Sequence, residues 1–156
     1  MVSAWRIVKR HHAKKAFDGE GARLYGGRWN RPGVRIVYTA ESRSLAALEM
    51  VAHLDSPELL DEYVVFEVGV PEPLITRVDL TRVPKNWRDN PPPPEVQEIG
   101  DAWVRAGTSA VLQAPSATLP AESNYLLNPR HPDFSRLRIG QPTRFLFDPR
   151  LAKRAQ

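Results

Sequence analysis

The amino-acid sequence predicts one domain of the α+β class. Its 156 residues match the length of a single ordinary domain. Short segments with the composition of β-strands recur along the chain, and two segments have the periodicity of amphipathic helices. Long irregular connections separate them, so the chain lacks the regular strand–helix alternation of a doubly wound fold. We therefore expect short strands and two helices around one core.

Three segments of the first half are predicted strands. Residues 5–9 (WRIVK) are short and apolar, and residues 35–39 (RIVYT) combine β-branched and aromatic side chains. Residues 62–70 (EYVVFEVGV) give the clearest alternation. The apolar residues that this alternation places on one face are Val64, Phe66, Val68 and Val70. Four glycines at positions 19, 21, 26 and 27 predict a turn or loop between the first two strands.

Two helices are expected, each with a recognisable start. The first begins at Ser42 or Ser44, since serine caps helix N-termini. Its apolar residues at helical spacing are Leu45, Leu48, Val51 and Ala52. The second begins near Pro94 and ends at Gly107, because proline suits a first helical turn and glycine a C-terminal cap. Its predicted buried stripe is Val96, Ile99, Trp103 and Val104.

A proline-rich segment separates the two halves of the chain. Residues 84–94 hold five prolines, four of them consecutive, which favours extended polyproline over helix or central strand. The pieces on either side are too small to be independent domains, so we interpret this segment as a long surface loop. Residues 110–113 and 143–147 are predicted strands, the second of them the last in the chain. The whole chain, 1–156, is thus read as one domain with a core of about 5–147 and a short basic C-terminal tail.

Composition narrows the possible functions. The absence of cysteine excludes disulfides, thiolate nucleophiles and the common structural zinc sites. No apolar run is long enough to cross a membrane, and no secretory signal is evident, so a cytoplasmic location is expected. The net charge is +4, with basic residues concentrated in residues 1–15 and 130–156 around an acidic middle. Such basic ends are usually solvated surfaces, although they leave nucleic-acid binding open.

Familiar catalytic motifs are missing, and three local clusters remain. There is no phosphate-binding loop, dinucleotide fingerprint, HExxH pair or GxSxG elbow, and the adjacent His11 and His12 make a poor metal site. The first cluster, residues 26–30 (GGRWN), places the guanidinium of Arg28 beside two glycines, either as a phosphate-binding group or as part of a tight turn. The second is Glu49, a carboxylate beside the apolar stripe of the first helix. Burying a carboxylate costs free energy, so we expect Glu49 either to be paired with another group or to take part in the function. The third, residues 115–129, contains Ser116 and Asn124 in what the sequence predicts to be a polar loop after a strand.

Taken in order, these clusters resemble the RES domain family. The matching segments are GGRWN at 26–30, VYTAES at 37–42, ALE at 47–49, APS at 114–116 and NYLLNP at 124–129. GEGAR at 19–23 and His131-Pro132 also fit, and the resemblance extends from about Trp5 to Phe147. The family takes its name from an arginine, a glutamate and a serine, which here are Arg28, Glu49 and Ser116.

The resemblance implies a fold, an activity and a partner. RES proteins have mixed sheets flanked by helices, similar to ADP-ribosyltransferases, and they are toxins of bacterial toxin–antitoxin pairs. They cleave the nicotinamide–ribose bond of NAD+, with water or phosphate as acceptor, and so arrest growth. NAD+ is then a substrate, and neither a cofactor nor a metal is expected. The cognate antitoxin is a helix-turn-helix protein of the Xre type that covers the active site, so contact with DNA is expected only through the antitoxin, and none with a membrane.

The same resemblance assigns roles to six residues. Arg28, Glu49 and Ser116 are the expected catalytic residues. Arg28 would bind pyrophosphate and Glu49 would stabilise the positive charge that develops on the ribose. The expected substrate-binding residues are Arg6, Tyr38 and Asn124.

Three other interpretations remain as alternatives. The first is transfer of ADP-ribose to a protein by the same site. The second, of a different class, is a nucleic-acid-binding module that uses the basic termini, whose binding would weaken steeply with salt. The third is an inactive structural partner of a repressor, which would cause no toxicity when expressed without that partner.

Overall fold

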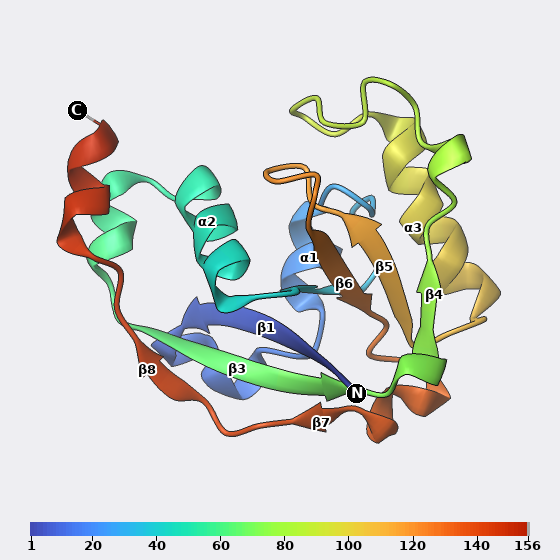
Figure 1. The fold of residues 1–156 in the computed structure, drawn as a ribbon, viewed down its shortest axis with the longest axis horizontal. Helices are drawn as coiled ribbons and strands as arrows, with labels where there is room; N and C mark the ends of the chain where they lie inside the picture. Colours follow the sequence, from blue (N-terminus) through green and yellow to red (C-terminus); the bar gives the residue numbers. More distant parts are fainter. Residues whose placement is uncertain (156) are drawn as a thin grey trace.

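A strongly curled sheet forms the centre of the protein, seen here in a computed structural model that describes residues 1–155 and the side chains of residues 1–152 (Figure 1). The strands are β1 (Val2–Lys9), β2 (Val37–Ala40), β3 (Tyr63–Val70), β4 (Ile75–Arg77), β5 (Val111–Pro115), β6 (Ser123–Leu127), β7 (Arg138–Ile139) and β8 (Thr143–Phe145). The α-helices are α1 (Glu20–Tyr25), α2 (Arg43–His53) and α3 (Pro94–Ala106). Short 3-10 turns occupy several of the connections, the last of them Pro149–Ala155.

Strand order explains the curl. The order is β4-β5-β6-β2-β1-β3-β7, with β8 also paired to β3, and every pairing is antiparallel except that of β4 with β5. β1 and β3 pair along eight residues, whereas β1 and β2 share the single residue pair Trp5–Ala40. This narrow junction lets the half formed by β1 and β3 turn away from the half formed by β5 and β6, as Figure 1 shows.

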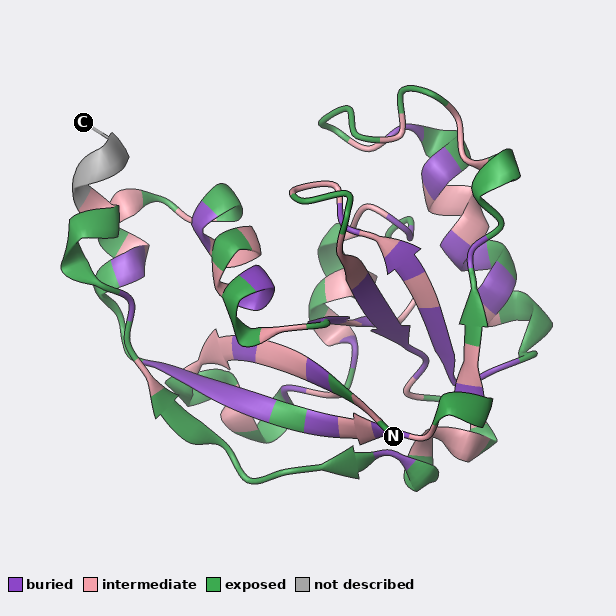
Figure 2. Cartoon of the chain, in the orientation of Figure 1, coloured by how far each residue is buried: buried purple, intermediate pink, exposed green. Residues whose placement is uncertain are grey.

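Each half of the sheet carries one main helix. α2 packs on β1 and β2 and buries Leu45, Ala46 and Val51 in a cluster with Ile7 and Val65. α3 covers the other half, where a second cluster contains the buried side chains Trp29, Ile36, Val96, Trp103, Leu112 and Leu126. Burial is nearly continuous along β5 and β6, while β7 and β8 are exposed edge strands (Figure 2).

The predicted α+β fold is confirmed, and most elements lie where the sequence places them. The segments 5–9, 35–39, 62–70 and 110–113 overlap β1, β2, β3 and β5. Ser42 caps α2 by accepting the N–H of Leu45, and α3 runs from Pro94 to a left-handed cap at Gly107. The four apolar residues predicted on one face of residues 62–70 are all buried. Residues 84–94 form a mostly exposed loop, as expected.

Several details of the prediction are wrong. The glycine-rich stretch contains α1, because Gly21 tolerates a helical conformation and the positive φ values of Gly19 and Gly26 delimit the helix. The segment interpreted as a polar loop contains β6, which the paired strands β2 and β5 stabilise. On α2, Leu48 is 43% exposed and Ala52 is also exposed, since Ala46 and Met50 face the core instead.

Two expectations lie beyond what the structure tests. The division into one domain with a core of about 5–147 stays a prediction. The side chains of Lys153 and Arg154 in the basic tail lie outside the described residues.

Within the described part of the chain, no helix is both long and apolar enough to cross a membrane.

Candidate active site

Three of the predicted site residues meet through direct hydrogen bonds. Glu49, on α2, accepts a hydrogen bond from Ser116 Oγ, with 2.8 Å between Oγ and Oε2. The amide of Asn124, on β6, donates to the other carboxylate oxygen, with 2.9 Å between Nδ2 and Oε1. A helix, the residue that follows β5 and a central strand thus converge on one carboxylate, which we call the Glu49 cluster (Glu49, Ser116 and Asn124).

The donors of this cluster are fixed in direction. Ser116 is fully buried, and its Oγ accepts the backbone N–H groups of Thr118 and Leu119 at 3.2 and 3.1 Å. A serine hydroxyl has two lone pairs, so these contacts leave its own hydrogen to point at Glu49. Asn124 Nδ2 is shared with the backbone carbonyl of Thr39 at 3.2 Å, which orients its amide toward α2.

The Glu49 carboxylate is half-buried and carries a perturbed pKa. Burial raises the pKa of Glu49, and the hydrogen bonds from Ser116 and Asn124 only partly offset this effect. An ionised carboxylate has about four acceptor sites, so two donors leave acceptor capacity for a ligand. The cluster therefore presents an oriented, partly desolvated negative group that can hydrogen-bond a hydroxyl or stabilise a developing cation.

Arg28 is held by the proline-rich loop. Its Nη1 donates to the backbone carbonyls of Trp87 and Asp89, at 2.8 Å in each case. Burial lowers the pKa of this guanidinium, which nevertheless stays charged near neutral pH. No hydrogen bond joins Arg28 to the Glu49 cluster within the described residues, so the structure places the two groups in separate polar networks.

A hollow of about 420 Å³ lies between the segments that carry these networks. Its lining includes Trp87, whose carbonyl holds Arg28, and Pro115 and Pro120, which flank the segment that contains Ser116. The side chains of Arg28, Glu49 and Ser116 are not part of its lining.

Tyr38 supports the loop that carries Arg28. Its hydroxyl donates to Asn30 Oδ1 at 2.5 Å and accepts the N–H of Trp29 at 3.1 Å. Gly27 packs directly on this hydroxyl, because a Cβ at Gly27 would lie 2.6 Å from it. Burial raises the pKa of Tyr38, so the phenol remains neutral.

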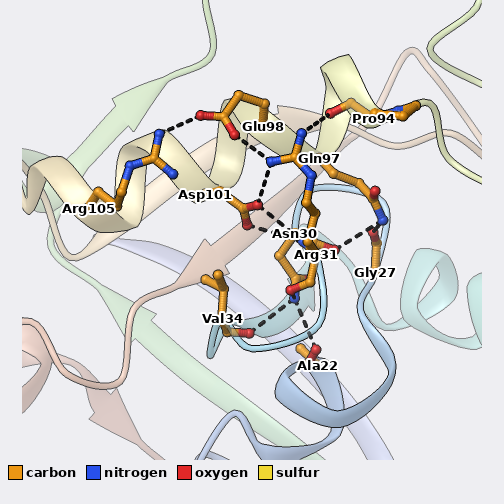
Figure 3. A network of polar contacts seen from close by, with 10 residues as sticks. All are labelled: Ala22, Gly27, Asn30, Arg31, Val34, Pro94, Gln97, Glu98, Asp101 and Arg105. Carbon is orange, nitrogen blue, oxygen red and sulfur yellow. Dashed lines mark hydrogen bonds and ion pairs between the residues drawn. The ribbon is translucent and has the colours of Figure 1, made fainter.

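Helix α3 holds the same loop from the other side (Figure 3). Gln97 Nε2 donates to the carbonyls of Gly27 and Asn30 at 3.1 and 3.2 Å. The buried Asp101 accepts from the backbone N–H and the guanidinium of Arg31, each at 3.2 Å. Burial raises the pKa of Asp101, and the contacts with Arg31 act in the opposite direction.

Arg6 contacts backbone rather than other predicted site side chains. Its Nε donates to the carbonyl of Ala16 at 2.6 Å and its Nη1 to that of Tyr38 at 2.9 Å. Burial lowers the pKa of Arg6 to about 10, against an opposing contribution from Asp18. As placed, Arg6 joins β2 to the segment after β1, and its contact with a substrate stays a prediction, as does that of Tyr38.

The sequence reasoning missed Gln97, Asp101 and Trp87. Asp101 is buried in α3 although it lies outside the face predicted from Val96, Ile99 and Trp103, so the spacing gave no signal for it. Trp87 acts through its carbonyl and Gln97 is an ordinary helical residue, so neither carried a signal. Among the described residues, no group of three or more His, Asp or Glu side chains converges to hold a metal ion.

Fold and site together define a small α+β domain with a curled sheet, in which an oriented glutamate and a loop-bound arginine occupy separate networks. The chain belongs to the RES domain family, whose model matches residues 3–148. That match covers the five segments on which the resemblance rested and confirms it.

Several relatives of this chain carry toxin names. Toxin Res of Yersinia enterocolitica serotype O:8 / biotype 1B is 40% identical over 94% of this chain and 97% of its own length. The Prs ADP-ribosylating toxin of Sphingobium sp. strain YBL2 is 38% identical over 99% of both chains. Among solved structures, the M. tuberculosis MbcT–MbcA toxin–antitoxin complex matches 99% of this chain and 88% of the chain compared, with a TM-score of 0.73. At 18% identity, this match supports the fold alone.

Proposed function

We propose that this protein is the toxin of a toxin–antitoxin pair and that its Glu49 cluster cleaves the nicotinamide–ribose bond of NAD+, with water or phosphate as acceptor. The observation that carries the proposal is the Glu49 carboxylate held between Ser116 Oγ and Asn124 Nδ2. Toxin names among the relatives support the first part. The name of the Sphingobium relative, an ADP-ribosylating toxin, points to NAD+ chemistry in that protein.

The chemistry suits a site with one carboxylate. Nicotinamide leaves NAD+ as a neutral molecule, so bond cleavage needs little acid catalysis and leaves an oxocarbenium-like ribose, as in glycoside hydrolysis. A negative group beside that ribose stabilises the transition state more than the ground state. Glu49 has this role in the proposal, while Ser116 and Asn124 keep its carboxylate in one orientation.

Arg28 would bind the pyrophosphate of NAD+. Guanidinium groups bind phosphate through paired N–H donors, and Arg28 Nη1 is already occupied by two backbone carbonyls. Its remaining N–H groups are then available to a ligand, with the loop fixing the direction in which they point. In this arrangement Tyr38 and α3 act by positioning the loop.

An antitoxin that covers the Glu49 cluster is part of the proposal. Leu48, next to Glu49, is 43% exposed, and Leu119, whose N–H binds Ser116 Oγ, is 38% exposed. Exposed leucines beside a polar cluster suit burial by a protein partner. The structural neighbour was solved as a toxin–antitoxin complex, and the RES resemblance implies an Xre-type helix-turn-helix partner here.

Transfer of ADP-ribose to a protein is the second candidate. It is favoured by the name of the Sphingobium relative, which aligns over nearly the full length of both chains. Both candidates use the same cluster and differ only in the acceptor.

The decisive experiment measures NAD+ in cells after induced expression and with purified protein. Wild type is compared with Glu49→Gln and Arg28→Ala, and with Glu95→Gln and Arg144→Ala, which alter exposed groups elsewhere. We expect NAD+ to disappear with wild type and both controls, and the rate to fall at least about 100-fold in Glu49→Gln, the scale of losing a group that stabilises transition-state charge. Thermal unfolding of each variant excludes misfolding as the cause.

Labelled NAD+ incubated with a cell lysate separates the candidates. Free label supports hydrolysis or phosphorolysis, and label on a protein supports transfer. Unchanged NAD+ together with arrested growth and no labelled protein would refute both. Salt-sensitive nucleic-acid binding that persists in Glu49→Gln would then support the nucleic-acid alternative.

A further inference from the structure

A second pocket lies at the opposite end of β6 from the Glu49 cluster. It measures about 360 Å³ and is lined by residues of the 128–132 segment, residues before β2, one residue of α1 and the C-terminal end of α3. Asn128, which lines it, follows Asn124 by four residues, and a strand rises about 3.4 Å per residue. The pocket is therefore on the order of 13 Å from the Glu49 cluster along this strand.

Three arginines line this pocket, and acidic groups compensate them incompletely. Arg23 binds both carboxylate oxygens of Glu20 through Nε and Nη2, and Arg35 Nη1 contacts the same carboxylate at 2.8 Å. One negative charge thus serves two guanidinium groups. The third, Arg130, has no ion pair within the described residues, and no carboxylate lines the pocket itself.

Arg35 also has an unused donor. Its Nε is the one side-chain nitrogen or oxygen among the described residues that is buried with no hydrogen-bond partner. Leaving a buried donor unpaired costs more than an ordinary hydrogen bond contributes. The same guanidinium has a second donor without a partner among the described residues, Nη2, because Nη1 alone contacts the Asp18 carbonyl and the Glu20 carboxylate.

The rest of the wall carries few charged groups. The His131 ring is held by two backbone contacts: Nδ1 accepts the N–H of Asp133, and Nε2 lies 2.9 Å from the carbonyl of Gly107. Val34 and Val104 add apolar surface. The pocket thus pairs excess positive charge with a small apolar wall, a combination that suits an anionic group attached to a compact organic body.

We propose that this pocket binds the phosphate group of a small phosphorylated ligand, at a site separate from the Glu49 cluster. Arg130 and Arg35 Nη2 hold the phosphate oxygens, because guanidinium donors match phosphate geometry. Val34 and Val104 contact the organic part. The site does not depend on the proposed NAD+ cleavage, since it shares no residue with that machinery.

Binding is measured by calorimetry at low salt with two probes, inorganic phosphate and adenosine monophosphate. The protein is the full chain carrying Glu49→Gln, which avoids toxicity. Added to it in turn are Arg130→Ala, the control Arg144→Ala on β8, and Arg28→Ala at the proposed NAD+ site. Arg130 is exposed, and its side chain makes no hydrogen bond or ion pair in the described part of the chain, so we expect its loss to leave the fold intact.

We expect one site per chain and an affinity that falls about tenfold in Arg130→Ala, equivalent to about 1.4 kcal/mol. Arg144→Ala and Arg28→Ala leave this affinity unchanged. Tighter binding of the nucleotide than of phosphate identifies a phosphate ester as the ligand class, and equal affinities identify inorganic phosphate. No saturable binding up to about 10 mM of either probe, or equal affinities in Arg130→Ala and its parent, overturns the proposal. Binding that only Arg28→Ala abolishes assigns the ligand to the NAD+ site instead.

Discussion

Gly100 packs against the backbone of the loop that carries Arg28, and its replacement by alanine should destabilise the protein. A Cβ built on Gly100 would lie 1.8 Å from the carbonyl oxygen of Trp29 and 2.9 Å from its carbonyl carbon. Real Cβ atoms essentially never come within 3.0 Å of another heavy atom, so the helix and the loop must separate by more than 1 Å. Both contacts are with backbone, which cannot rotate away as a side chain can.

Two opposing contributions set the magnitude. Alanine is favoured over glycine inside a helix by about 1 kcal/mol. Overpacking a well-packed interior costs about 1–3 kcal/mol, and more where backbone must move. Because this clash is severe and involves backbone, we expect a net loss of about 2 kcal/mol in the free energy of unfolding. For a chain of this size, that lowers Tm by roughly 4–8 °C.

Gly21→Ala is the matched control, since Gly21 lies in α1 with nothing within 4 Å of its missing Cβ. There the same substitution should leave Tm unchanged or raise it by up to about 4 °C. Thermal unfolding followed by circular dichroism gives both values. A higher Tm for Gly100→Ala than for wild type would refute the contact between α3 and the 26–30 loop as described.

Two further predictions concern Tyr38 and Glu49. Tyr38→Phe leaves the N–H of Trp29 and the Oδ1 of Asn30 without this partner, so urea denaturation should show a loss of about 1–3 kcal/mol in the free energy of unfolding. The control Tyr25→Phe, at a position 84% exposed, should show no loss. Equal stabilities of the two variants would contradict the assigned hydrogen bonds. Burial raises the pKa of Glu49 above that of an exposed glutamate, so the proposed NAD+ cleavage, which needs the carboxylate, should fall as pH decreases through that raised value. Stability should respond to pH in the opposite direction, because the folded state binds the Glu49 proton more tightly than the unfolded state. Wild type should therefore gain stability relative to Glu49→Gln as pH falls over the same range. A constant difference in stability between the two proteins would show that the pKa of Glu49 is not raised on folding.

The sequence predicted those parts of the fold that depend on local patterns. Strand β3 was visible because alternating valines and a phenylalanine occupy it, and α3 because Pro94 and Gly107 mark its ends. β6 was missed because its polar residues, Ser123 and Asn124, are characteristic of loops, and only pairing with β2 and β5 makes them a strand. α1 was missed because glycine has a low helical propensity, and glycines lie inside this helix and at both of its ends.

Some residues of the candidate site could likewise be predicted from the sequence, and others could not. Local arguments marked Glu49 as an unusual carboxylate on a helix and grouped Ser116 with Asn124 in a polar segment. The family resemblance gave these residues roles, and the structure brings all three into contact. The surroundings of Arg28 could not be foreseen, since they depend on backbone carbonyls 59 and 61 residues away in the chain. Such contacts leave no trace in residue type.

The grip on Arg28 has a consequence for how related chains diverge. Every amino acid carries a backbone carbonyl, so the side chains of Trp87 and Asp89 can be exchanged without removing the two acceptors. What cannot change freely is the length and path of the loop that presents them. Among relatives, insertions and deletions near this loop should therefore be rarer than substitutions within it, and an alignment scored by residue identity alone would overlook the constraint.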